Sequence, residues 1–195
     1  MPLSPPVDRE DIHTRRIECR GYRRADGLWD IEGHITDVKA YAFDNADRGR
    51  IDPGVPLHDM WLRLTVDDAF QIRAVEAVTD ASPYSVCGAI TSNFQRLVGL
   101  TIGPGFTRRV KERLGGAEGC THLVDLVGPV ATTAFQTLNP ILAREGRNAP
   151  LTSGSPARRP RIIDSCHAYA SDGEIVRARW PEYYTGPGSK EGPAG

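Results

Sequence analysis

Hydrophobic and polar residues alternate along residues 29–36, with apolar residues at every second position. A period of two places the apolar side chains on one face of a β-strand and the polar ones on the other. The apolar positions of this stretch are Trp29, Ile31, Gly33 and Ile35. Ala25-Asp26-Gly27 supplies turn chemistry just before it, so residues 13–20 are predicted to form the preceding strand of a hairpin.

The same alternation returns in residues 60–66 and continues in residues 70–74. The apolar positions are Met60, Leu62, Leu64 and Val66, and then Phe70, Ile72 and Ala74. Asp67-Asp68 stands between the two stretches and can turn the chain. A second hairpin is therefore predicted here.

Helical periodicity follows the second hairpin. Residues 89–99 are short and amphipathic, and Phe106, Val110 and Leu114 recur every four residues before Gly115-Gly116 stops the pattern. A longer helix is expected to open at Cys120 or Thr121 and to end near Pro140. The predicted fold class is therefore α+β, an antiparallel sheet of hairpins packed by three or so helices.

The remaining segments complete the predicted domain organisation. Residues 1–12 are expected to be a flexible N-terminus, and residues 13–184 a single domain containing an exposed linker at 145–161. Apolar pairs at 162–163 and 175–176 flank Ser171-Asp172-Gly173, which predicts a small C-terminal hairpin. The tail at 185–195 is expected to be disordered.

Composition narrows the function classes. The 195 residues are 39% hydrophobic and 25% charged with a formal net charge of −1, so no basic field exists to hold nucleic acid or an anionic membrane. No stretch approaches the roughly 18 apolar residues of a membrane span, and the N-terminus lacks the apolar core of a secretory signal. A cytoplasmic protein with four reduced cysteines is expected, and a homo-oligomer is compatible with the sequence. Neither a P-loop nor a GxGxxG motif occurs, so no nucleotide cofactor is expected.

Metal-capable side chains gather at the ends of predicted elements, in residues 57–60, 83–88 and 119–122. The candidate ligands are His58, Asp59, Cys87, Cys120 and His122, a set with the nitrogen, sulfur and oxygen donors that Zn²⁺ prefers. A thiol at a helix N-terminus, as predicted for Cys120, is favoured as the thiolate. The alternative is that the cysteines are small core residues without a ligand role.

A charged stripe along the strand predicted at residues 29–36 and its flanks is a second candidate. It contains Arg23, Arg24, Asp26, Asp30, Glu32, His34, Asp37 and Lys39. Arg23 and Arg24 could clamp a carboxylate, with His34 or Glu32 as the proton carrier. The alternative is a solvated strand face with cross-strand ion pairs. Arg108 and Arg109, on the predicted basic helix, could bind a substrate anion or form a plain solvated helix face.

Two family resemblances are carried by short motifs. The order His58-Asp59, strand, turn, strand, Cys87-Gly88, helix, Cys120, long helix resembles the iron–sulfur scaffold family of IscU and SufU over residues 55–140. The resemblance implies that His58 replaces the first scaffold cysteine, which suits Zn²⁺ better than a cluster. The segments 22–33, 58–61 and 164–169 (YRRADGLWDIEG, HDMW and DSCHAY) resemble an uncharacterised bacterial domain-of-unknown-function family over nearly the whole chain.

These observations lead to two expectations for function. The first is a small-molecule catabolic enzyme, a non-redox lyase (retro-aldol or decarboxylating) acting on an aromatic or acyl carboxylate or carbonyl compound. Zn²⁺ would be held by Cys87, Cys120, His122 and His58, and His58 or Asp59 could instead remain unligated as the proton carrier. The alternative is an IscU-like metal or iron–sulfur carrier, as the order of elements implies.

Overall fold

The computed structural model describes residues 3–147 and 159–188. Contacts divide the chain into two compact units, Met1–Phe135 and Gln136–Gly195, which are described separately below. The single domain expected over residues 13–184 stays a prediction. Of the expected linker and tail, residues 148–158 and 189–195 lie outside the described residues.

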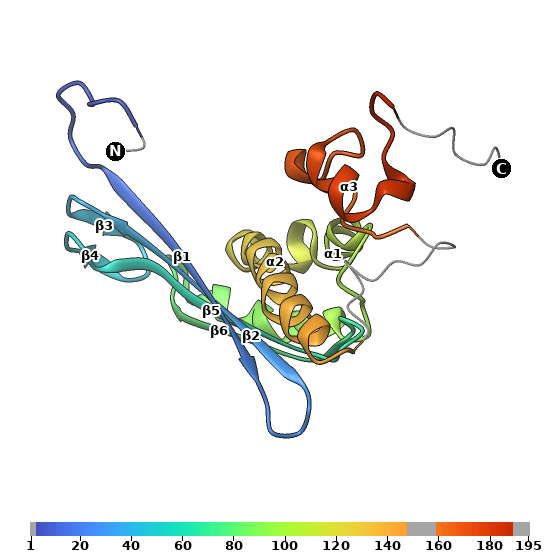
Figure 1. The fold of residues 1–195 in the computed structure, drawn as a ribbon. Coiled ribbons are helices and arrows are strands. Elements are labelled where there is room, and N and C mark those ends of the chain that lie inside the picture. Colours follow the sequence, from blue (N-terminus) through green and yellow to red (C-terminus); the bar gives the residue numbers. More distant parts are fainter. Residues whose placement is uncertain (1–2, 148–158, 189–195) are drawn as a thin grey trace. The chain divides into compact units, whose positions relative to one another are not determined.

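A four-stranded antiparallel sheet forms the first unit, with the strand order β1-β2-β5-β6 (Figure 1). Its strands are β1 (His13–Arg23), β2 (Trp29–Lys39), β5 (Pro56–Val66) and β6 (Ile72–Ala81). Both predicted hairpins are confirmed, β1 with β2 and β5 with β6. The connection from β2 to β5 contains a second, two-stranded sheet of β3 (Phe43–Asn45) and β4 (Gly49–Ile51).

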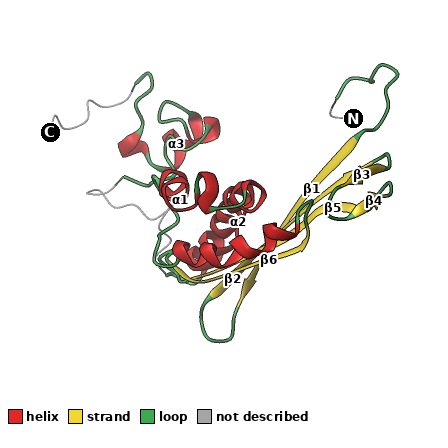
Figure 2. Cartoon of the chain, turned by 180° about the vertical axis from the view of Figure 1, so that it is seen from behind, coloured by secondary structure: helices red, strands yellow, loops and turns green. Residues whose placement is uncertain are grey.

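Helices cover one face of the four-stranded sheet and leave the other face open (Figures 1 and 2). They are η1 (Ser85–Leu97), α1 (Phe106–Leu114), η2 (Gly116–Glu118) and, up to Phe135 where the first unit ends, α2 (Thr121–Arg144). The segment predicted as a short amphipathic helix at 89–99 is part of η1, a 3₁₀ helix that buries Phe94 and Leu97. The α+β fold class is therefore confirmed.

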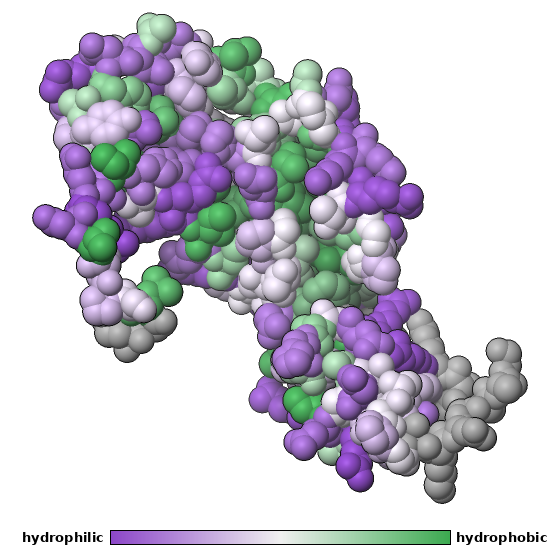
Figure 3. All heavy atoms as spheres, turned by 90° about the horizontal axis from the view of Figure 1, so that it is seen from above, coloured by the Kyte–Doolittle hydropathy of each residue, from purple (hydrophilic) through white to green (hydrophobic). Residues whose placement is uncertain are grey.

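The helix-covered face of the sheet is the hydrophobic core. The odd-numbered apolar residues of β2 are buried, and so are Met60, Leu62, Leu64 and Val66 of β5, as the alternation predicts. Sheet and helix approach each other closely at Gly33, where a Cβ would lie 2.5 Å from Cγ2 of Val130 and 3.0 Å from Cδ1 of Leu126. Space-filling Figure 3 shows apolar side chains gathered into a band bordered by hydrophilic ones.

The second unit differs from its prediction. Its described residues after 158 form η3 (His167–Tyr169), α3 (Glu174–Arg179) and η4 (Pro181–Tyr183), so the predicted small C-terminal hairpin is wrong. Gly173 stands at the N-cap of α3 and Glu174 in its first turn, where a negative charge is favourable. Ile175 is 39% exposed while Val176 is buried, so the apolar pair contributes one residue to the interior rather than a strand face.

Candidate metal centre

Three neighbouring strands place Arg15, Asp37 and His58 in one row across the sheet. Arg15 of β1 is opposite Asp37 of β2, and Asp37 is opposite His58 of β5. Asp37 follows the buried odd positions of β2, and His58 precedes the buried even positions of β5. Both side chains therefore point to the helix-covered face, and Asp37 is only 1% exposed.

The Asp37 carboxylate is held from β1. Arg15 donates from Nε to Oδ1 at 2.8 Å and from Nη2 to Oδ2 at 2.9 Å, and His13 Nε2 lies 3.0 Å from Oδ1. Burial alone would raise the pKa of Asp37, but the hydrogen bonds and charge of Arg15, with the His13 contact, hold that pKa below its ordinary value. The centre of the site is thus a buried, ionised carboxylate.

His58 lies against the second carboxylate oxygen without a hydrogen bond. Its Nδ1 is 3.1 Å from Oδ2 of Asp37, yet this buried atom has no hydrogen-bond partner among the described residues. The 3.1 Å approach is therefore a close contact that does not have the geometry of a full hydrogen bond. Burial, with the neighbouring His122, lowers the pKa of His58 from 6.5 to about 4, so the ring is neutral at pH 7.

His122 comes from the first turn of α2 and completes the group. Its ring stacks on that of His58, with centroids 3.6 Å apart and planes 29° from parallel, and its Nε2 lies 3.8 Å from Oδ2 of Asp37. Burial, followed by the charge of Arg15, lowers the pKa of His122 as well. Two neutral imidazoles thus face one carboxylate, and one ligand atom of each residue lies within 4.8 Å of the others.

The spacing of these atoms fits a shared metal ion. Atoms that share one tetrahedral Zn²⁺ lie about 3.3 Å apart, because each is about 2 Å from the ion. The approaches of His58 and His122 to Oδ2, 3.1 Å and 3.8 Å, bracket that value. Three protein ligands with a position left open is the arrangement of catalytic rather than structural zinc sites. The structure thus provides a group that could bind a metal, made of Asp37, His58 and His122.

The cysteines predicted as ligands lie outside this group. Cys120 precedes the first residue of α2, and its Sγ is 3.9 Å from Nδ1 of His122 and 3.9 Å from Sδ of Met60. Cys87 is half-buried in η1 and is absent from the metal-capable group found among the described residues. Of the predicted ligands, the structure brings His58 and His122 together, with Cys120 beside them.

Three of the predicted proton carriers, Glu32, His34 and Asp59, lie on the opposite, open face of the sheet, whereas the fourth, His58, belongs to the metal-capable group. His34 Nε2 is 2.6 Å from Oδ1 of Asp59, and the His34 ring stacks on Trp61 with centroids 3.7 Å apart. Glu32 accepts a 2.8 Å hydrogen bond from Nε of Arg63. Asp59 follows His58 in sequence, and the pleat of β5 therefore turns it away from the metal-capable group.

The four arginines predicted to bind substrate contact other parts of the protein. Arg24 pairs with Asp26 and Asp30, and the guanidinium of Arg23 lies over the Trp29 ring at 5.4 Å from its centroid. Arg109 donates to the backbone carbonyls of Thr101 and Pro104. Arg108 lies 3.7 Å from Glu112, one turn along α1.

Sequence reasoning missed Arg15 and His13 as site residues, and it named Asp37 only as a member of the charged stripe, not as a metal ligand. The placement of Asp37 on the polar face of its strand is wrong, because it is buried on the other face. The available signal was its odd number, which continues the apolar series of β2. A polar residue at a position of the buried, apolar series is unusual and therefore informative.

Comparisons with known proteins add a family and no activity. A family model described as a protein of unknown function (DUF2889) matches residues 13–136, which include every residue of the metal-capable group and its β1 partners. No curated protein and no solved structure matches the chain. In the part of the chain that the structure describes, no helix has the length and apolar character needed to cross a membrane.

Proposed function

The chain belongs to this family, DUF2889, and we propose that it is a metal-dependent enzyme acting on a small carboxylate or carbonyl compound. Zn²⁺ held by Asp37, His58 and His122 is the proposed cofactor. The observation that carries the proposal is the buried Nδ1 of His58, which lies 3.1 Å from an ionised carboxylate oxygen and makes no hydrogen bond among the described residues.

An unsatisfied buried nitrogen is costly, by about 1–3 kcal/mol. A cation between His58 and Asp37 would satisfy that nitrogen and the carboxylate together. Arg15 and His13 contact the same carboxylate from the β1 side, as outer partners that fix the orientation of a metal ligand do. The donor set and its support therefore favour a resident ion over a chance cluster.

The proposed reaction needs a Lewis acid and a proton carrier, and different groups would supply them. Bound Zn²⁺ would supply a Lewis acid for a carbonyl or carboxylate oxygen. His13 contacts Oδ1 of Asp37, stays outside the group of three and has a 38% exposed side chain, so it can exchange protons with solvent while the carboxylate orients it. We assign the proton transfer to His13, in place of the expected His34, Glu32 and Asp59, which face away.

The reaction class follows from these two functions. Retro-aldol cleavage and decarboxylation both leave negative charge on a carbonyl-derived oxygen and both end with a proton transfer to carbon. A cation at the oxygen and an imidazole beside it meet these needs without electron transfer. We therefore propose a non-redox lyase acting on an aromatic or acyl compound of this kind.

The IscU-like carrier is the competing proposal, and it depends on thiolates. Cys87 stands outside the group, and Cys120 is 3.9 Å from His122 rather than directed at Asp37. A carrier would hold its cargo through Cys87 and Cys120, whereas the lyase needs neither. The two proposals therefore make opposite predictions for the same cysteine variants.

Metal content of the purified full-length chain tests the proposal, measured by elemental analysis with visible spectra. We expect one zinc per chain in the wild type, loss of that zinc in His58→Phe and His122→Ala, and full retention in the matched control Cys87→Ala. Bound iron with labile sulfide that disappears in Cys87→Ala would establish the carrier instead. Iron without sulfide, at a two-histidine, one-carboxylate site, would contradict the non-redox chemistry.

A further inference from the structure

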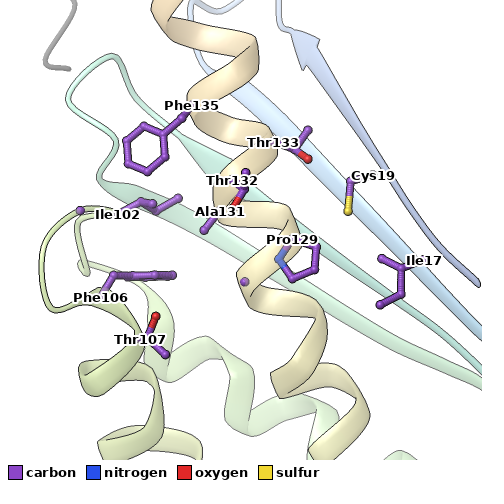
Figure 4. A pocket seen from close by; sticks show the side chains of 12 residues that line it. Ile17, Cys19, Ile102, Phe106, Thr107, Pro129, Ala131, Thr132, Thr133 and Phe135 are labelled. Carbon is purple, nitrogen blue, oxygen red and sulfur yellow. The ribbon is translucent and has the colours of Figure 1, made fainter. Parts of the chain in front are cut away.

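A groove lies along β1 and α2 beyond the metal-capable group. It encloses about 700 Å³, and most of its lining is apolar. Figure 4 shows Ile17 and Cys19 of β1 on one side of α2, with Pro129 and Thr133 of the helix turned toward them, and Phe106 of α1 on the other side of the helix.

Contacts between β1 and α2 connect the metal-capable group to the groove. Arg15 of β1 approaches Asp125 of α2, with Nη1 and Oδ2 3.6 Å apart, and four residues further along β1 the Cys19 thiol interacts with the Thr133 hydroxyl. Four strand residues span about 13 Å and eight helical residues about 12 Å, so β1 and α2 run side by side in step. Ile17 and Pro129 fall midway between these two contacts. One continuous path thus leads from the Arg15 end to Cys19.

Charge is concentrated at one end of this path. Nε and Nη2 of Arg15 bind Asp37, and Nη1 lies 3.6 Å from Oδ2 of Asp125, a distance longer than a hydrogen bond. Asp125 is 63% exposed and can swing into solvent. An anionic group arriving there would meet the guanidinium and the proposed ion together, while the rest of the molecule would lie on apolar side chains.

We propose that the groove binds the apolar body of a carboxylate substrate whose carboxylate lies at Arg15 and the metal centre. This inference rests on the proposed function and names its substrate class, an aromatic or acyl carboxylate with an extended body of about 10 Å, somewhat shorter than the β1 path. The small carboxylates that lack such a body are poor ligands of the site.

Octanoate and acetate are the probes, since they share a carboxylate and differ only in the apolar chain. Calorimetric titration of the zinc-loaded full-length protein should show octanoate binding about 100-fold more tightly than acetate, because burying roughly three to four of its six additional methylenes, at roughly fourfold each, gives that ratio. With Mn²⁺ in place of zinc, relaxation of octanoate protons should be strongest next to the carboxylate and fall steadily toward the methyl end.

Two tryptophan substitutions on α2 test where the apolar chain of octanoate binds. Thr132 is exposed and lines the groove, so Thr132→Trp should fill it and reduce octanoate affinity to that of acetate, with metal affinity unchanged. Ala143→Trp is the matched control, exposed on the same helix about 16 Å further along, and should bind octanoate like the wild type.

The outcomes separate the two proposals. Metal binding with equal affinities for octanoate and acetate, or equal effects of the two tryptophans, overturns the groove assignment and leaves the metal centre standing. Failure of the wild-type chain to bind metal overturns the proposed function and the substrate class with it.

Discussion

The folding stability of the metal-free protein should depend on pH through His58. Its pKa is about 4 in the folded protein against 6.5 ordinarily, because burial and His122 disfavour the charged ring. Between these pH values the unfolded chain binds the proton and the folded chain does not, so stability falls as pH falls. The contribution is complete above pH 6.5 and lost below about pH 4.

The magnitude follows from the two pKa values. A difference of about 2.5 pH units at about 1.4 kcal/mol each gives about 3 kcal/mol in all, of which about 2 kcal/mol is lost between pH 7 and pH 5. Asp37 does not contribute to the change between pH 7 and pH 5. Its pKa is lowered in the folded protein, so the stability that Asp37 contributes is lost only as the pH falls below its ordinary pKa of 3.8. His122 has a lowered pKa and acts in the same direction as His58.

Urea unfolding in the presence of EDTA, at intervals from pH 4.5 to 7.5, measures the effect. His58→Phe keeps a flat ring against His122 but removes the titrating nitrogen, so its stability should change with pH less steeply than that of the wild type. Ile35→Val, a buried change on the same face of β2, should lower stability by about 0.5–1.5 kcal/mol equally at every pH. Wild-type stability that is the same at pH 5 and pH 7, or a His58→Phe slope equal to that of the wild type, would refute the reasoning.

Three further predictions concern the sheet and its two faces. Gly33→Ala should lower the free energy of unfolding by about 1–3 kcal/mol in denaturant titrations, because its Cβ would lie 2.5 Å from Val130. Gly88→Ala, with open space around it, should lower it far less, and similar losses for the two variants would contradict this packing. Arg15→Lys should destabilise the metal-free protein by about 1–3 kcal/mol, because Asp37 loses a partner that donates two hydrogen bonds. Saturating zinc should reduce the difference in stability from the wild type, and a difference that zinc leaves unchanged would argue against a cation beside Asp37. His34→Ala should leave zinc affinity within about threefold of the wild type in a chelator competition, because its side chain occupies the open face of the sheet; a large loss would place the ion elsewhere.

Alternation predicted the sheet because its cause is local. Trp29, Ile31 and Ile35 are buried on one side of β2, and Met60, Leu62 and Leu64 on one side of β5, so a period of two is sufficient to identify both strands and the hairpins they form. The third predicted stretch was less regular in the structure. Phe70 adopts a positive φ of 62° in the turn, and a register shift between Thr65 and Val66 places Val75 rather than Ala74 in the core.

The candidate site depended on pairings that no local pattern contains. His58 and His122 were identified by residue type, but the only local sign of their common partner Asp37 is its odd position in the apolar series of β2. Arg15 and His13 join the site because β1 pairs with β2 in one particular register, which a sequence gives only through the turn between them. Cys87 was favoured for its thiol, and η1 holds it outside the group.

The ligand atoms around the bound ion test the central claim most directly. Zinc X-ray absorption spectroscopy on the loaded full-length protein distinguishes nitrogen and oxygen ligands at about 2.0–2.1 Å from sulfur at about 2.3 Å. A centre made by Asp37, His58 and His122 predicts a shell of nitrogen and oxygen with the outer scattering of two imidazoles and no sulfur. A shell containing one or more sulfur atoms would contradict it and would return the ion to Cys87 or Cys120.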